Sequence, residues 1–305
     1  MTGTPNGTSS SATSGYRPSP RPTFDSATAI RQRDAVRYTW GDDESGEVLD
    51  WLYVSSGSVH QLLFGLAAGA SFRHSDQFRT IFAADEVLTV LSGTMMITQP
   101  VTGEAHRVET GESVFFRRDT WHHAYALGDQ PLRVLEFFAP PPSAGASGTY
   151  ARTLPLLTEP RLADDSLIGD VVPGRASQRQ DAFTVIRRSD VRWRLEEGVP
   201  SPVPIGFLAS TEHLTVGTVD LVAGQRTAWR THAGDLCGYV LDAPLALGVE
   251  GPDARKWFEL EPGDGEALHA LAVLQGEAGD WGQAFGTLPA GIDYPAIIAR
   301  STPPV

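Results

Sequence analysis

Two histidines and one glutamate, each on a short segment of strand-like composition, are the residues in this sequence best suited to chemistry. His74 lies in the first segment, and Glu86 begins an apolar run that ends at Gly93. His122 closes a later segment that begins at Gly111. Two imidazoles and one carboxylate that leave the remaining positions open suit an octahedral divalent metal, above all non-haem Fe(II). The pattern indicates a catalytic centre, because a closed structural site would want four protein ligands.

For two of the three candidate ligands, His122 and Glu86, the sequence also allows another interpretation. His123 adjoins His122, and neighbours on a strand point to opposite faces, so only one of them can face a barrel interior. The spacing from Gly111 selects His122. Glu86 could instead be a strand-end carboxylate that faces water, as Asp85 is expected to do. An unpaired carboxylate inside a barrel is costly, and metal coordination would relieve that cost.

His74 has a polar context and could lie in a surface turn. The only other histidines upstream of His122 are His60 and His106. His60 lies on the preceding strand, where it is either a core residue or part of the cavity lining. His106 is expected in a loop, which leaves His74 as the best third ligand.

Composition describes a turn-rich chain of 305 residues with 31 Gly, 22 Pro and 41% hydrophobic residues. This length allows two domains. The net charge of −13 argues against nucleic acid as a partner, since phosphates require a clustered basic face. The single cysteine, Cys237, excludes an internal disulfide and fits a reducing compartment.

The first 23 residues are rich in Ser, Thr, Gly and Pro and lack the apolar core of a signal peptide. They predict a disordered leader over residues 1–23. No apolar run approaches the length that a membrane span needs. We therefore expect a cytoplasmic protein without a membrane partner.

Short β-branched and aromatic runs, separated by Gly, Pro and Asp, recur through both halves and predict an all-β sandwich or barrel. A Pro- and Gly-rich stretch at 140–148 ends the first series. The segment 30–38 resembles 186–193, and Leu66-Ala-Ala-Gly-Ala-Ser resembles Leu221-Val-Ala-Gly-Gln-Arg. The common offset of about 155 residues favours an internal duplication.

The spacing from Glu86 to Gly93, and from Gly111 to His122, resembles the two sequence motifs of the cupin superfamily. The resemblance covers roughly residues 30–140 and, more weakly, 183–286. It implies two cupin-type barrels (double-stranded β-helix or jelly-roll) in tandem. We expect a leader at 1–23, an N-terminal barrel with the metal site at 24–148, a connector at 149–182, with a short helix near 156–168, and a C-terminal barrel at 183–305.

The chain departs from the family pattern in both motifs. A single histidine, His74, stands where the family often has a His-x-His pair. In the second motif Arg117 and Asp119 replace Pro and Gly. In the second half, alignment places Leu236 where the glutamate belongs and Leu274 where the second histidine belongs. The C-terminal site is therefore expected to be degenerate, although His232, Asp235 and His269 could in principle form a different one.

Open coordination positions need a substrate pocket around them. The residues expected to supply it are His60, Arg79, Phe116 and Trp121. Aromatic side chains would form apolar walls, and an arginine could grip a carboxylate with two hydrogen bonds.

The resemblance implies one divalent metal per chain, Fe(II) first, with Mn, Ni and Zn as alternatives. We expect a cupin oxygenase or dioxygenase that acts on a small organic acid or phenol. The alternatives are a non-redox isomerase, lyase or decarboxylase in which the metal is a Lewis acid, and a non-catalytic small-molecule-binding cupin. The partner is a small molecule, and whether the chain forms a homodimer stays open.

Overall fold

The computed structural model describes residues 20–42, 45–73, 84–100, 102–117, 120–139, 182–196, 201–211, 213–231, 235–250, 255–268, 273–278 and 282–288. Within these ranges the regular structure is β-strand apart from two short 3-10 helices, η1 (Gln32–Asp34) and η5 (Arg188–Asp190). The expected all-β fold is confirmed. No helix in the described ranges is long and apolar enough to span a membrane. His74, Arg79, Asp119, His232, His269, residues 1–19 of the expected leader and the expected helix near 156–168 lie outside the described residues.

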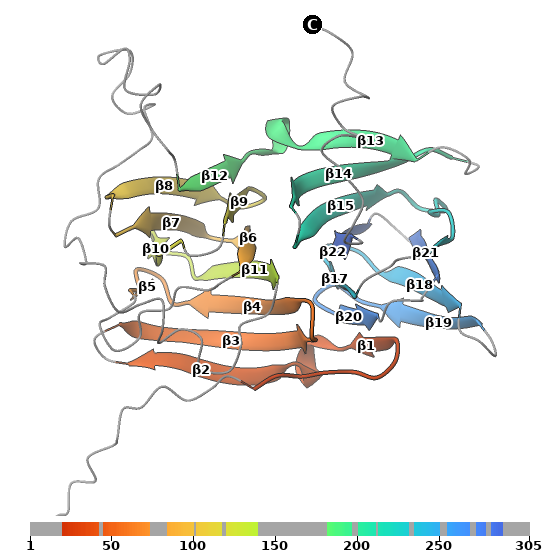
Figure 1. The fold of residues 1–305 in the computed structure, drawn as a ribbon, viewed down its shortest axis with the longest axis horizontal. Coiled ribbons are helices and arrows are strands. Elements are labelled where there is room, and N and C mark those ends of the chain that lie inside the picture. The colour runs from red at the N-terminus through yellow and green to blue at the C-terminus, as the bar shows by residue number, and fades with distance from the viewer. Residues whose placement is uncertain are drawn as a thin grey trace, which may run out of the picture.

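The N-terminal barrel consists of two antiparallel sheets (Figure 1). Its large sheet has the order β12 (Phe183–Ile186), β9 (Ser113–Phe116), β6 (Asp85–Ser92), β11 (Leu132–Ala139), β4 (His60–Leu66), β3 (Gly46–Ser55) and β2 (Val36–Asp42). Its small sheet has the order β5 (Ser71–Phe72), β10 (His123–Leu127), β7 (Thr94–Gln99) and β8 (Glu104–Glu109). Gly93 makes the tight turn between β6 and β7 at φ 81°, where a Cβ would lie 2.8 Å from the Pro131 carbonyl oxygen. Only glycine fits there without strain.

The C-terminal barrel repeats this arrangement. Its large sheet has the order β1 (Thr28–Ile30), β20 (Gly265–Leu268), β17 (Leu236–Val240), β22 (Gly282–Leu288), β15 (Thr215–Leu221), β14 (Val203–Ser210) and β13 (Arg192–Glu196). Its small sheet has the order β16 (Arg230–Thr231), β21 (Val273–Ala278), β18 (Leu245–Glu250) and β19 (Arg255–Leu260). Two sheets of the same strand count and equivalent order in each half agree with the duplication that the sequence predicts.

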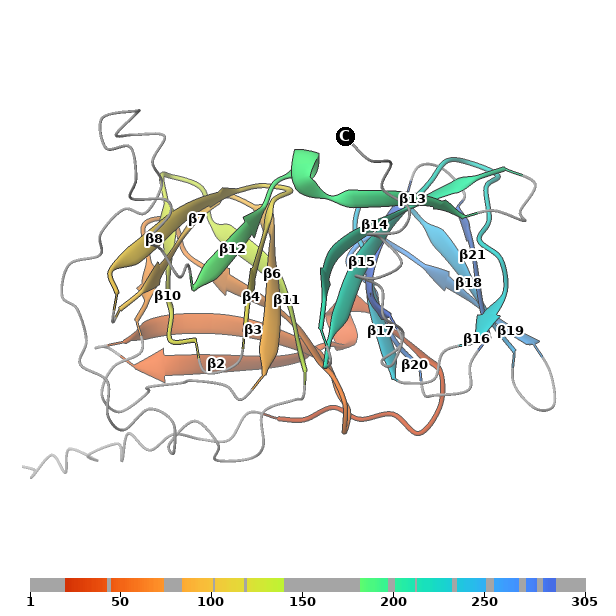
Figure 2. The ribbon, with the colours of Figure 1, turned by 45° about the horizontal axis from the view of Figure 1, so that its top comes forward.

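Each barrel receives one strand from the other half of the chain. β1, which precedes the N-terminal barrel, pairs with β20 of the C-terminal barrel. β12, which precedes the C-terminal barrel, pairs with β9 of the N-terminal barrel. In Figure 2, β12 lies in the N-terminal barrel while η5 and β13 carry the chain over to the other barrel. The sequence boundary at residue 183 therefore does not coincide with the spatial boundary between the barrels.

The chain also contacts the N-terminal barrel upstream of residue 24. The backbone amide of Ser55 on β3 donates to the Pro22 carbonyl oxygen at 2.6 Å, and Arg21 Nε donates to the Ser55 hydroxyl at 3.0 Å. Residues 20–23 thus lie along β3, although the sequence predicted them as part of a disordered leader.

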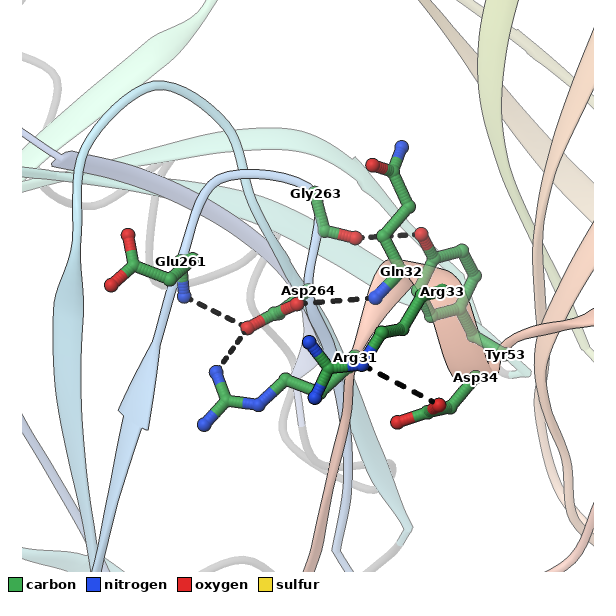
Figure 3. Close-up of polar contacts among 8 residues, drawn as sticks. All are labelled: Arg31, Gln32, Arg33, Asp34, Tyr53, Glu261, Gly263 and Asp264. Carbon is green, nitrogen blue, oxygen red and sulfur yellow. Dashed lines mark hydrogen bonds and ion pairs between the residues drawn. The ribbon is translucent and has the colours of Figure 1, made fainter.

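A polar clasp holds η1 against the C-terminal barrel (Figure 3). One carboxylate oxygen of Asp264 accepts from the Gln32 amide at 3.1 Å. The other accepts from the Glu261 amide at 2.9 Å and from the Arg31 guanidinium at 2.5 Å. The buried Tyr53 hydroxyl donates to the Gly263 carbonyl oxygen at 2.6 Å. Chain segments more than 200 residues apart are joined here, which fixes one barrel on the other.

Equivalent but weaker contacts occur near η5, where the chain crosses from the N-terminal to the C-terminal barrel. The turn from Glu109 to Glu112 matches the turn from Glu261 to Asp264, and Glu112 Oε2 accepts from the Glu109 amide at 2.9 Å. Arg187, the residue equivalent to Arg31, has its Nε 3.9 Å from Glu112 Oε1. The two crossings are therefore related by a pseudo-twofold axis between the barrels.

Candidate metal centre

Glu86 points into the N-terminal barrel. On β6 it shares a face with Leu88 and Val90, which belong to the core cluster inside this barrel. Val87 lies on the opposite face and belongs to the cluster between the barrels. Glu86 is 1% exposed, and its Oε2 has no hydrogen-bond partner. A buried carboxylate oxygen without a partner is a costly arrangement that a bound cation would relieve.

A second carboxylate, which the sequence analysis missed, lies beside Glu86. Glu136 on β11 shares a face with Val134 and Phe138 of the same core cluster and therefore faces the same interior. Burial raises the pKa of Glu136 to about 7, and burial together with the Glu136 charge raises the pKa of Glu86. The two groups are close enough to perturb each other. Glu136 is the one charged residue in the apolar run 134–139 of β11, and this placement is the signal that could have identified it.

His122 has the geometry and protonation state of a metal ligand. Its ring lies 4.7 Å from that of Phe116, the residue paired with Glu86 on the neighbouring strand. Its Nδ1 lies 3.2 Å from the Thr120 carbonyl oxygen, which can only accept, so Nδ1 carries the proton and Nε2 keeps its lone pair. Burial lowers the pKa of His122 to about 4, so the ring is neutral at pH 7, as a ligand must be.

His123 points to the other face of β10. Ala124 and Ala126 belong to the interior cluster, so His123 and Tyr125 alternate away from it. The His123 ring contacts that of Trp121 at 6.1 Å, and burial is the main cause that lowers its pKa to about 3. This alternation supports His122, rather than His123, as the interior ligand.

The expected pocket residues have different positions in the described structure. Phe116 and His60 are buried on the interior side of the N-terminal barrel, with the His60 ring 4.4 Å from that of Phe138 and its Nδ1 2.9 Å from the Ser55 hydroxyl. Burial is the main cause that lowers the pKa of His60 to about 3. Trp121 is 1% exposed and contacts His123. His60 and Phe116 are thus placed to line the interior, and Trp121 packs behind it.

Two further expectations are wrong. Asp85, expected to face water, is fully buried, and one of its carboxylate oxygens lies 3.0 Å from Arg117 Nε. The ion pair compensates the buried charge, which a strand-end position in the sequence does not reveal. His106, expected in a loop, lies on β8, where its Nε2 is 2.7 Å from the Glu104 carboxylate.

The chemistry of this donor set fits a divalent metal. His122 with its Nε2 lone pair, Glu86 with its unpartnered oxygen and the neighbouring Glu136 are an imidazole and two carboxylates, the ligand types that divalent metals bind. Within the described residues no group of three His, Cys, Asp or Glu side chains is assembled for a metal. The third predicted ligand, His74, lies outside those residues.

Comparison with known proteins connects this geometry to a family. The cupin domain family matches residues 83–138, which include Glu86, His122 and Glu136. Residues 83–138 are therefore identified as a cupin domain. The fold of the chain, with two cupin barrels in tandem, is shared by solved proteins of low sequence identity. The sequence matches none of the curated proteins with which it was compared.

Three solved structures illustrate the likeness. A candidate glyoxylate-induced protein from Pseudomonas aeruginosa has a TM-score of 0.61 at 15% identity, with 90% of this chain and 92% of that chain covered. Oxalate decarboxylase from Bacillus subtilis, studied for its Mn(II) centres, has a TM-score of 0.59 at 15% identity, with 89% and 80% covered. A candidate dioxygenase from Nostoc punctiforme has a TM-score of 0.58 at 12% identity, with 87% and 84% covered.

The C-terminal barrel has different residues at the positions equivalent to Glu86 and His122. Leu236 pairs with Leu268 as Glu86 pairs with Phe116. Leu274 occupies the position of His122, because β21 pairs with β18 in the register in which β10 pairs with β7. Arg230 pairs with Leu274, so the residue beside this position is a cation and not His232. The ladders support the expected loss of the metal site in this half.

We therefore predict about one bound metal per chain. His232→Ala should leave metal content unchanged, because its barrel has Leu236 and Leu274 at the other two positions and a lone imidazole holds a divalent ion poorly. His74→Ala should remove the metal. Elemental analysis of the purified variants measures this directly. A stoichiometry near two that falls to one in His232→Ala would show that Asp235 and His269 form a site of their own.

The two adjacent histidines give a second prediction. His122→Ala should lose the metal because it removes the interior imidazole, whereas His123→Ala should retain it. Both side chains are buried, so thermal unfolding of the two variants serves as the control for packing damage. Metal loss in His123→Ala with retention in His122→Ala would shift the assignment by one residue.

Proposed function

We propose that this cupin is a mononuclear metal-dependent enzyme with its centre in the N-terminal barrel. The observation that carries the proposal is the buried, unpartnered carboxylate oxygen of Glu86, next to a second carboxylate and on the same side of the barrel as the neutral ring of His122. Glu86, His122 and His74 would hold the metal. Phe72 on β5 pairs with Ala124 on the antiparallel strand β10. In sequence, His74 comes two residues after Phe72 and His122 two residues before Ala124, in agreement with that ligand set.

Fe(II) is the metal we favour, and oxygen-dependent oxidation of a small organic acid or phenol is the reaction. Two imidazoles and one carboxylate leave coordination positions for substrate and dioxygen, and the bound metal would supply the redox chemistry. The protein's own contribution is to orient the ligands through the Thr120 carbonyl and to exclude water. Phe116, Phe138 and Leu88 form apolar walls around the carboxylates. The Nostoc punctiforme structure described as a candidate dioxygenase shares the fold.

A second candidate function rests on Glu136. A carboxyl group whose pKa is near neutrality and which lies beside a ligand can hold a proton and return it to a substrate carbon or oxygen. Non-redox cleavage of a small carboxylic acid uses such a group, with a divalent metal polarising the substrate. The likeness to oxalate decarboxylase, with its Mn(II) centres, is in line with this alternative.

Metal analysis and oxygen measurement separate these candidates. The protein is purified, its metals are quantified, and samples reconstituted with Fe(II) or Mn(II) are exposed to small carboxylic acids and phenols in an oxygen electrode and in anaerobic CO₂ assays. Substrate-triggered oxygen uptake by the Fe(II) form supports the oxygenase. Turnover without oxygen supports the non-redox enzyme. Ligand binding without turnover in either form would point to a binding protein and contradict the proposal.

A further inference from the structure

A cavity of about 570 Å³ lies between the two barrels, outside both barrel interiors. Residues of both halves line it: Thr89 and Ser113 from the N-terminal barrel, Leu208, Thr218 and Tyr239 from the C-terminal barrel, and Arg188 from η5. On β6, Thr89 shares a face with Val87 of the inter-barrel cluster, and Glu86 lies on the opposite face. The volume is within the range of about 300–1,000 Å³ typical of small-molecule pockets.

The pseudo-twofold axis accounts for the cavity at this end of the interface. Tyr53 lies at the register shift between Leu52 and Val54 of β3, and Leu208 lies at the equivalent shift between Phe207 and Ala209 of β14. Tyr239 pairs with Gly265 as Thr89 pairs with Ser113. Where one end of the interface has two tyrosines, the other end has a leucine and a threonine.

The two tyrosines are buried and pack against each other. Tyr53 and Tyr239 pack edge to face at 5.6 Å, and the Tyr53 ring lies on Gly265, where an added Cβ would be 2.4 Å from it. The equivalent pair, Leu208 and Thr89, has much less volume. Leu208 and Thr89 therefore leave space at this end that the equivalent tyrosines would occupy, and Tyr239 also reaches the wall of the cavity.

The walls of the cavity carry two arginines, two aspartates and several hydroxyl groups. Among the described residues neither Arg133 nor Arg188 has a carboxylate partner, whereas Asp220 and Asp242, which also line the cavity, have partners of their own. Arg133 is held with its guanidinium 5.3 Å from the Trp51 ring centroid. Within the described part of the chain, no carboxylate thus pairs with either guanidinium group.

Hydroxyl groups add uncharged polar surface to the cavity wall. Thr218 is 4% exposed, and its hydroxyl is buried without a hydrogen-bond partner. The Thr89 and Ser113 hydroxyls lie 2.8 Å apart, and one of the two keeps a proton to donate elsewhere. Unsatisfied buried hydroxyls are uncommon and call for a partner.

We propose that this cavity binds a small organic carboxylate at a site distinct from the metal centre. The carboxylate accepts hydrogen bonds from the Arg188 and Arg133 guanidinium groups, which match its planar geometry. The body of the ligand lies between Leu208 and Trp193, and any hydroxyl that it carries contacts Thr89, Ser113 or Thr218. The site lies on the outer face of the same strands β6 and β9 whose inner face holds Glu86.

The pseudo-twofold relation suggests the substitutions for the test, with thermal unfolding as the packing control because Ser113 stands where the opposite end has Gly265. Leu208→Tyr places at the cavity the residue that fills the opposite end, and Arg188→Gln places there the equivalent of Gln32, which packs on Gly263. Arg194→Gln is the matched control, because Arg194 is equally an exposed cation of this region but does not line the cavity. Binding of malonate is measured by titration calorimetry on the full chain at constant ionic strength, with chloride as the competing simple anion.

The expected result is saturable malonate binding that is weakened about tenfold or more by Arg188→Gln, since a charge-assisted contact is lost, and abolished by Leu208→Tyr. Binding should persist in Arg194→Gln and in Glu86→Gln, which tests the metal centre separately. Wild-type affinity in both Leu208→Tyr and Arg188→Gln overturns the proposal. Loss of binding in Glu86→Gln alone would assign malonate to the metal, which also overturns the cavity site but leaves the proposed function intact. Equal competition by chloride overturns the carboxylate class.

Discussion

Glu86→Gln is expected to fold and to lose its bound metal. The substitution keeps the shape of a side chain that is 1% exposed and replaces a charged ligand by a neutral amide, which binds a hard divalent ion weakly. It also removes the repulsion between two buried carboxylates, so the metal-free fold should be no less stable than wild type. Metal affinity should fall about hundredfold or more, beyond the about 10–100-fold that loss of an outer-shell partner costs.

Elemental analysis and metal titration followed by spectroscopy measure this change. Glu47→Gln is the matched control, because Glu47 is an exposed carboxylate on β3 and should keep full occupancy. Glu136→Gln is the graded comparison: as a neighbour of the ligand it should weaken binding less than Glu86→Gln does. Full occupancy in Glu86→Gln would remove this residue from the metal site and with it the main support for the proposed function.

Asp264→Ala is expected to cause the largest loss of stability among substitutions of polar residues between the barrels. The side chain is 6% exposed and accepts from two backbone amides and from Arg31, so its removal leaves buried donors without partners. Because Arg31 is 35% exposed, its ion pair is partly screened, and most of the cost comes from the two amides. We expect about 2–4 kcal/mol in the free energy of unfolding.

Urea unfolding followed by tryptophan fluorescence measures this loss. Two substitutions bracket it within the same protein. Glu112→Ala, at the equivalent position of the weaker crossing, should cost about 1 kcal/mol, because it leaves one amide unpaired and its arginine lies at 3.9 Å. Glu250→Ala breaks an exposed ion pair with Arg255 and should cost less than about 1 kcal/mol. If Asp264→Ala cost no more than Glu250→Ala, the clasp would not stabilise the docking of the two barrels.

The sequence by itself determined the fold class and the duplication. Strand-like runs separated by Gly and Pro are local signals, and they suffice for an all-β chain because strand propensity and turns act over short range. Two resembling segments at one offset sufficed for two halves, because duplicated barrels keep their turns and strand starts. Spacing also predicted the replacement of Glu86 and His122 by Leu236 and Leu274 in the second half. The strand ladders place both leucines at those positions.

Other features depend on which strands become neighbours, and only the tertiary structure decided them. Glu136 lies beside Glu86 because β11 pairs with β6 in a register that puts both carboxylates on one face. Asp85 is buried because Arg117 reaches it. The exchange of β1 and β12 and the cavity between Leu208 and Thr89 arise where segments more than 60 residues apart in sequence meet. Local sequence carries no information about such contacts, since the residues that create them are adjacent in space alone.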